Sequence, residues 1–231
     1  MKTTVLLLAI FLIPFSGYSQ FEYKGITVDG SVNHRELNDT TQWNTVVREP
    51  DVIIRESDTG FYIAIMSNTY TSVNLYIDQR PETIKVLHAS YSLGIATYKK
   101  TYKGQWSVID GVADEESGKK VYNWKFRDPI IRDVSATINL PTEMETFYTE
   151  NQWISNTMPM GSYREVEFLL SKDLVSDFGK IFLTYLKKDL DDKTVLIYFP
   201  NTTKTIAGNE ELDKELQSGY LLKISHFEFR K

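Results

Sequence analysis

Residues 163–170 read YREVEFLL, and the alternation of apolar and charged residues in this stretch decides the fold class. Because successive side chains of a β-strand point to opposite faces, Val166 and Phe168 share one face, and Glu165 and Glu167 share the other. Such alternation is typical of an antiparallel sheet with one face on the core and the other in water. The stretch therefore predicts a half-buried strand with both glutamates on its solvated face.

The same period of two recurs on both sides of this stretch. Residues 73–78 also alternate, whereas residues 61–66 and 195–199 are apolar on both faces, as expected for central strands of two packed sheets. Turn sequences such as Lys103-Gly104 separate the strands. Short strands that recur about every eight to twelve residues, with turns between them, predict a β-sandwich or barrel. Further strands are expected at residues 52–55, 84–88, 91–98, 105–109, 120–126, 130–138, 146–150, 181–186 and 220–229.

Helical patterns are scarce in this chain. Residues 171–177 begin with a capping serine and are predicted to form one or two helical turns, and residues 209–217 form a second helical candidate. No repeat, linker or change in composition divides residues 20–231. We therefore expect an all-β fold: a single-domain antiparallel two-sheet β-sandwich, jelly-roll or immunoglobulin-like, with one or two short helices.

The first 19 residues have the layout of a secretory signal peptide. Lys2 precedes an apolar stretch at residues 5–15, and the small residues Gly17 and Ser19 occupy the positions expected before a cleavage site. The apolar stretch is shorter than the roughly 20 residues that a membrane-spanning helix needs, and no later segment reaches that length. The sequence predicts a secreted or periplasmic bacterial protein, cleaved after Ser19 and without a membrane span.

The composition excludes several classes of function. The 231 residues include 26 Lys and Arg against 31 Asp and Glu, a net charge of -5, so the basic surface that nucleic-acid binding requires is not expected. The chain has no cysteine and therefore no disulfide, zinc thiolate site, iron-sulfur cluster or thiol nucleophile. Stability must come from burial of the apolar residues, which are 42% of the chain.

A series of short motifs resembles a known family. In chain order these are Ile26 to Gly30, Trp43, the turn and strand at residues 58–65, the strand at residues 73–78 that ends in an acid, His88, Gly94, residues 165–170 and Phe199-Pro200. Their order resembles family 9 carbohydrate-binding modules and the related DOMON-like β-sandwiches of secreted bacterial proteins, over residues 26–229. The resemblance implies a β-sandwich in which two tryptophans clamp a terminal sugar and calcium ions support loops, without assigning either tryptophan.

Aromatic residues are the candidate sugar contacts, because the C–H faces of a pyranose are apolar while its hydroxyl groups need hydrogen bonds. The chain has 14 tyrosines and 4 tryptophans. Trp106 and Trp153 lie near expected loops, and Trp124 lies in an aromatic stripe on one strand face. We predict that Trp106, Trp124 and Trp153 are carbohydrate-binding residues, with packing in the core as the alternative for each. Trp43 is expected in the core.

No cofactor is expected, and calcium is the metal that the sequence leaves open. The acidic clusters at residues 114–116 and 189–192 supply oxygen ligands without the spacing of a known calcium loop, so solvated charge runs are the alternative. His34, His88 and His226 lack the spacing of metal ligands. His88 follows an apolar run and is expected to be a hydrogen-bonded residue of the sandwich.

Three functions compete, and the first is preferred. A noncatalytic domain that holds a glycan through surface aromatics fits the resemblance. The alternative is a structural or protein-interaction sandwich without a small ligand, which buried tryptophans would favour. A polysaccharide-acting enzyme comes third, because Glu165 and Glu167 are expected on a solvated face where nothing raises a carboxyl pKa, and no Gly-x-Ser-x-Gly elbow or phosphate loop occurs.

Overall fold

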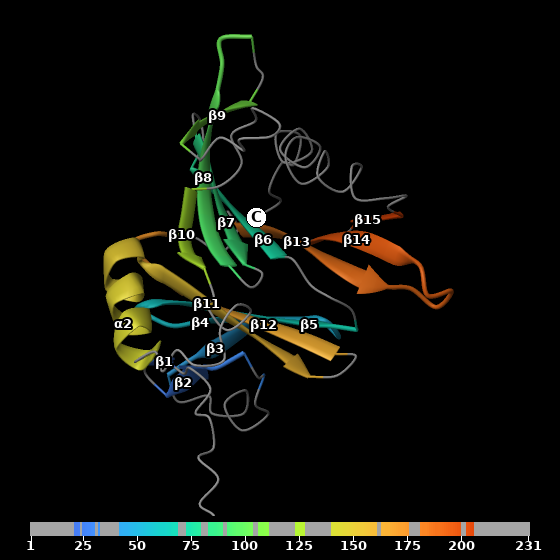
Figure 1. Ribbon diagram of the computed structural model, residues 1–231, viewed down its shortest axis with the longest axis horizontal. Coiled ribbons are helices and arrows are strands. Elements are labelled where there is room, and N and C mark those ends of the chain that lie inside the picture. The colour runs from blue at the N-terminus through green and yellow to red at the C-terminus, as the bar shows by residue number, and fades with distance from the viewer. Residues whose placement is uncertain are drawn as a thin grey trace, which may run out of the picture.

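Two antiparallel sheets dominate the computed structural model (Figure 1). The structure describes residues 21–23, 25–30, 32, 42–68, 73–79, 83–89, 92–103, 106–110, 123–127, 140–160, 163–175, 181–199 and 202–205. Most of these residues lie in strands, and a single helix occurs within the described ranges. The prediction of an all-β antiparallel sandwich of two sheets is therefore confirmed.

The smaller sheet has five strands in the order β11-β12-β5-β4-β3. Their bounds are β3 Asn44–Arg48, β4 Val52–Glu56, β5 Gly60–Ser67, β11 Trp153–Met160 and β12 Tyr163–Ser171. Strand β12, which contains the stretch that predicted the fold, lies between β11 and β5. The register places Glu167 opposite Ala64 and Leu169 opposite Tyr62, so these four side chains share one face of the sheet.

The larger sheet has eight strands, seven of them in the order β10-β8-β7-β6-β13-β14-β15. Their bounds are β6 Val73–Gln79, β7 Thr83–Ala89, β8 Ser92–Lys100, β10 Asn123–Arg127, β13 Ile181–Lys188, β14 Thr194–Phe199 and β15 Thr202–Thr205; the eighth strand, β9 Trp106–Asp110, pairs with β8. Strand β8 pairs with β10 through its first half and with β9 through its second half. The β8–β9 hairpin extends past the end of the sheet (Figure 1).

The core lies between the two sheets. Ile63, Val166 and Phe168 face inward from the smaller sheet, and Leu75 and Leu183 face inward from the larger one. All five side chains are almost completely removed from water, and they belong to one continuous apolar cluster. Burial of this apolar surface stabilises a chain that has no disulfide.

Helix α2, Leu140–Asn151, closes one end of the sandwich, so the strand predicted at residues 146–150 is wrong. Phe147 and Tyr148 favour strands locally, but Met144, Phe147 and Tyr148 follow the three-to-four-residue spacing of a helix face and pack inward. The helix ends because Gln152 adopts φ 65° and its N–H donates to the Tyr148 carbonyl at 2.7 Å.

Of the one or two helical turns predicted at residues 171–177, the described residues 171–175 form one hydrogen-bonded turn. Strand β12 runs to Ser171, whose Oγ accepts from Asp173 N–H at 3.1 Å, as a capping serine does. The Ser171 carbonyl accepts from Leu174 and Val175, and no helix follows within the described residues. The segments predicted at residues 130–138, 209–217 and 220–229 lie outside the described ranges, as does the predicted signal peptide at residues 1–19.

A short N-terminal hairpin covers the side of the smaller sheet that faces away from the larger one (Figure 1). It consists of β1, Phe21–Tyr23, and β2, Ile26–Val28. The Tyr148 ring of α2 contacts the rings of Phe21 and Tyr23 at centroid distances of 5.1 and 5.4 Å. The smaller sheet is therefore covered on both faces.

Gly60 is the residue at which the smaller sheet tolerates no side chain. A Cβ atom at this position would lie 2.2 Å from the Leu170 carbonyl oxygen, which belongs to the backbone of β12. We expect Gly60→Ala to lower the free energy of unfolding by about 2 kcal/mol or more, because two paired strands must separate to relieve the clash. Urea unfolding of the purified protein measures this change.

Gly25→Ala is the matched control. Gly25 has φ 77°, and a Cβ atom added there would have no neighbouring atom within 4 Å, so alanine meets only the conformational cost of about 1 kcal/mol. An equal loss of stability in both variants would show that the contact between Gly60 and Leu170 is not the cause.

Candidate functional site

Trp153, one of the three predicted sugar contacts, lies in the core. Its side chain is 0% exposed. The indole meets the Phe147 ring edge-on at a centroid distance of 5.4 Å and stacks with the Phe168 ring at 6.3 Å. The polar neighbours Asn151 and Gln152, which suggested a ligand site, instead bond to carbonyls of α2. Trp153 therefore lacks the exposed ring face that direct sugar contact requires.

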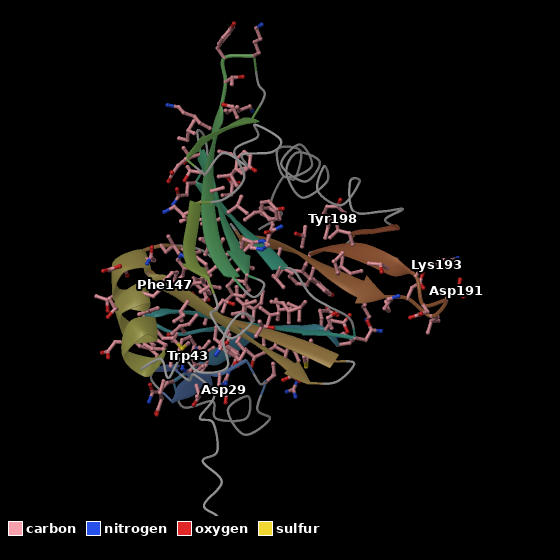
Figure 2. The ribbon with its side chains drawn as sticks, in the orientation of Figure 1. Asp29, Trp43, Phe147, Asp191, Lys193 and Tyr198 are labelled. Atoms are coloured by element: carbon pink, nitrogen blue, oxygen red, sulfur yellow. The ribbon has the colours of Figure 1, made fainter. Side chains whose placement is uncertain are left out.

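The other tryptophans are divided between the core and one edge of the larger sheet. Trp43 is buried, as expected, and its carbonyl accepts from Arg55 Nη2 at 2.9 Å (Figure 2). Trp106 on β9 pairs with Lys100 of β8, and Trp124 on β10 pairs with Gly94 of β8. Both backbones thus lie along the same edge of β8, while their side chains lie outside the described part of the structure. Their predicted role in sugar binding stays a prediction.

Glu167 is fully buried, so the prediction that it lies on a solvated face is wrong. The segment after β2 covers it, and Glu167 Oε2 accepts from Asp29 N–H at 3.0 Å and Gly30 N–H at 2.7 Å. Its Oε1 accepts from the Tyr62 hydroxyl at 2.5 Å. Glu165 is half-buried, and its Oε2 accepts from Val32 N–H at 2.5 Å. The alternation of the sequence correctly places Glu165 and Glu167 on the face away from the core. It does not show that the segment after β2 covers this face.

These contacts give the two glutamates a structural role. Both oxygens of Glu167 have donors, which compensate for the removal of the carboxylate from water. The fully buried Arg55 lies opposite Tyr62 in the register and therefore on the same face as Glu167, so the face carries one buried charge of each sign. A lone arginine in the apolar run at residues 52–55 was the sequence signal for this buried polar layer.

A second buried polar row crosses the larger sheet, on its face away from the smaller sheet. Thr184, Asn74 and His88 are successive register partners on β13, β6 and β7, and Gly94 on β8 follows them. His88 Nδ1 lies 2.7 Å from Asn74 Oδ1. Burial lowers the pKa of His88 to about 4, so the ring is neutral at pH 7. His88 is thus a hydrogen-bonded residue of the sandwich, as expected.

The β8–β9 hairpin carries the most exposed aromatic ring among the side chains that the structure describes. Tyr102 at its turn is 94% exposed, and Lys103 Nζ lies 5.6 Å from the centre of the Tyr102 ring. Lys100 is exposed, and Ile109 on β9 is 50% exposed. Sequence reasoning missed Tyr102 because it sought tryptophans, although an aromatic residue beside the Lys103-Gly104 turn was visible. The hairpin is the candidate binding element.

The acidic cluster at residues 189–192 forms the turn between β13 and β14 (Figure 2). Asp189 Oδ1 accepts from the N–H groups of Asp191 and Lys193, both at 2.9 Å, and Lys193 Nζ lies 3.4 Å from Asp191 Oδ2. Within the described ranges, no group of three or more histidines or acids is placed to hold a metal ion. The cluster at residues 114–116 lies outside those ranges.

Comparisons with known proteins add no relative. No family model, no curated protein and no solved structure matches the chain. Among the described residues, no helix has both the length and the apolar character needed to cross a membrane.

Glu167→Gln tests the attachment of the N-terminal segment. The amide nitrogen of glutamine cannot accept a hydrogen bond, so at least one donor among Tyr62, Asp29 and Gly30 loses its partner. We expect the free energy of unfolding to fall by about 1 to 3 kcal/mol and the amides of Asp29 and Gly30 to exchange faster with deuterium. Glu165→Gln, at a half-buried position, is the control with a smaller expected effect. Unchanged exchange at Asp29 and Gly30 would contradict the anchoring role.

The lowered pKa of His88 should make the free energy of unfolding depend on pH. Its folded pKa of about 4 lies below the ordinary value of 6.5, so the unfolded chain binds the extra proton between these values. This contribution is fully present above pH 6.5 and is lost as the pH falls towards 4, by at most about 3 kcal/mol. Urea unfolding between pH 7 and 4 should show a shallower decline for His88→Gln than for the natural chain. Parallel declines would refute the assignment.

Proposed function

We propose that this chain is a noncatalytic, exported carbohydrate-binding protein that contacts its glycan through the β8–β9 hairpin. The observation that carries the proposal is the exposed ring of Tyr102 at the tip of a hairpin that extends beyond the sheet. An exposed phenol presents an apolar face to the C–H groups of a sugar and a hydroxyl to its edge. Lys103 beside the ring adds a donor for sugar hydroxyl groups.

The base of the hairpin supports such a site. Strand β8 pairs with β7 along residues 83–89, and Leu93, Ala96 and Tyr98 are buried at its foot. Burial raises the pKa of Tyr98 to about 12. A strand fixed in this way brings Tyr102 to the ligand with little loss of backbone freedom.

Trp106 and Trp124 are further candidate contacts, because their strands pair with the same edge of β8. Trp106 lies on the second strand of the hairpin, and Trp124 lies on the neighbouring strand β10. The sequence predicts both residues as sugar contacts, and three aromatic contacts would hold successive sugar residues of a chain better than one ring does. The proposal therefore favours an oligosaccharide or polysaccharide over a single sugar.

A protein-binding role is the second candidate. Trp43 and Trp153 are both buried, and Ile109, on the same hairpin as Tyr102, offers an aliphatic side chain that suits a protein surface better than a sugar. An enzymatic role has less support, because Glu165 and Glu167 bind backbone N–H groups of the N-terminal segment instead of facing a substrate.

Binding of the purified protein to a glycan array tests the proposal. We expect Tyr102→Ala to weaken binding to the best glycan about tenfold, because stacking on the ring is lost, and Tyr102→Phe to keep most of it. Both variants should keep the unfolding midpoint of the natural chain, because Tyr102 is exposed.

Leu190→Ala is the matched control for this experiment. Leu190 is a large exposed side chain at the turn between β13 and β14, away from the β8–β9 hairpin, and its loss should leave glycan binding unchanged. No binding to any glycan, or binding that Tyr102→Ala does not affect, would contradict the proposal. Protein capture that depends on Ile109 would favour the second candidate.

A further inference from the structure

We propose that the glycan is anionic, carrying carboxylate or sulfate groups; this inference rests on the function proposed above. It follows from a contrast of charge between the hairpin and the protein. Residues 92–110 contain three lysines, Lys99, Lys100 and Lys103, against one acid, Asp110, whereas the whole chain has a net charge of -5. The proposed binding element is thus locally basic in an acidic protein.

The positions of these lysines suit a ligand that lies along the hairpin. Lys99 and Lys100 are neighbours on β8 and are both exposed, and successive strand residues point to opposite faces. A chain that approaches Tyr102 along the face that carries Lys100 therefore passes an ammonium group. Lys103 lies at the tip, with its Nζ 5.6 Å from the Tyr102 ring centre, so charge and stacking surface are adjacent.

Four other lysines of the described residues form ion pairs with carboxylates. Lys172 pairs with Glu56, Lys187 with Asp51, Lys188 with Asp192 and Lys193 with Asp191. Among the described residues, Lys100 and Lys103 have no such carboxylate partner, and Lys103 instead faces an aromatic ring. A carboxylate or sulfate on the ligand would supply the missing counter-charge.

The combination of charges and ring favours an acidic glycan over an acidic peptide. The lysines alone would attract either polymer, because attraction between exposed charges depends little on the molecule that carries them. The face of Tyr102 adds a requirement for a flat apolar surface, which the C–H face of a pyranose provides and an acidic peptide chain lacks. The experiment must therefore separate the charge of the ligand from its sugar rings.

Three polymers with one backbone make this separation. Dextran, carboxymethyl-dextran and dextran sulfate share their sugar chain and differ in charge, and titration calorimetry of the full chain measures each affinity. We expect the carboxymethyl or sulfate form to bind at least tenfold more tightly than dextran at low ionic strength. The difference should shrink at about 0.5 M salt, where the screening length falls below 5 Å.

The double variant Lys100→Gln, Lys103→Gln tests the hairpin itself. Each exposed charge pair is worth about two- to fivefold in affinity, so together the two substitutions should weaken binding of the anionic polymer about tenfold. Arg48→Gln with Lys193→Gln removes the same charge from exposed positions on β3 and the turn between β13 and β14. This matched control should bind the polymer like the natural chain.

The outcomes separate this inference from the proposed function. Equal binding of dextran and its charged forms would overturn the anionic ligand while leaving glycan binding intact. An equal loss in the control variant would assign the effect to net charge and would also overturn it, as would the absence of binding to all three polymers. Binding of polyglutamate as tightly as dextran sulfate, with no effect of Tyr102→Ala, would overturn both proposals.

Discussion

A carboxylate without access to water organises the smaller sheet. Glu167 is 0% exposed. Its Oε1 accepts a hydrogen bond from the Tyr62 hydroxyl, and its Oε2 accepts from the backbone N–H groups of Asp29 and Gly30. An ionised group in such a place is stable only while these donors stay, since the cost of leaving a buried charge unsatisfied exceeds the net value of any single hydrogen bond. The fold therefore requires the N-terminal segment to remain on the sheet.

Coverage of the smaller sheet on both faces follows from this attachment. With β1, β2 and α2 in place, β12 and β5 are buried on both faces. Gly60 approaches the Leu170 backbone closely because β5 pairs with β12 and glycine has no Cβ atom. The buried apolar surface stabilises the chain without a disulfide. In the larger sheet, in contrast, the β8–β9 hairpin extends past the end of the sheet, and Tyr102, Lys100 and Lys103 are exposed there.

The candidate site was only partly visible in the sequence. The sequence predicts tryptophans as sugar contacts, yet Trp153 stacks with Phe168 in the core, while the Tyr102 ring is exposed. The local sequence around a tryptophan with polar neighbours is the same whether those neighbours bind a ligand or bond to the end of a helix. Asn151 does the latter here. The exposure of an aromatic residue depends on which segment packs over it, and local sequence does not contain that information.

The sequence by itself determined the strand pattern, because period-two alternation in stretches such as residues 163–170 is a local consequence of the extended backbone. It also determined the reliance on apolar burial, since no cysteine is present. Only the tertiary structure decided that Glu167 is buried, that residues 146–150 are helical and that Tyr102 is exposed. The burial of Glu167 and the helix depend on contacts between residues far apart in the chain, which override local propensity, and the exposure of Tyr102 depends on where the β8–β9 hairpin lies.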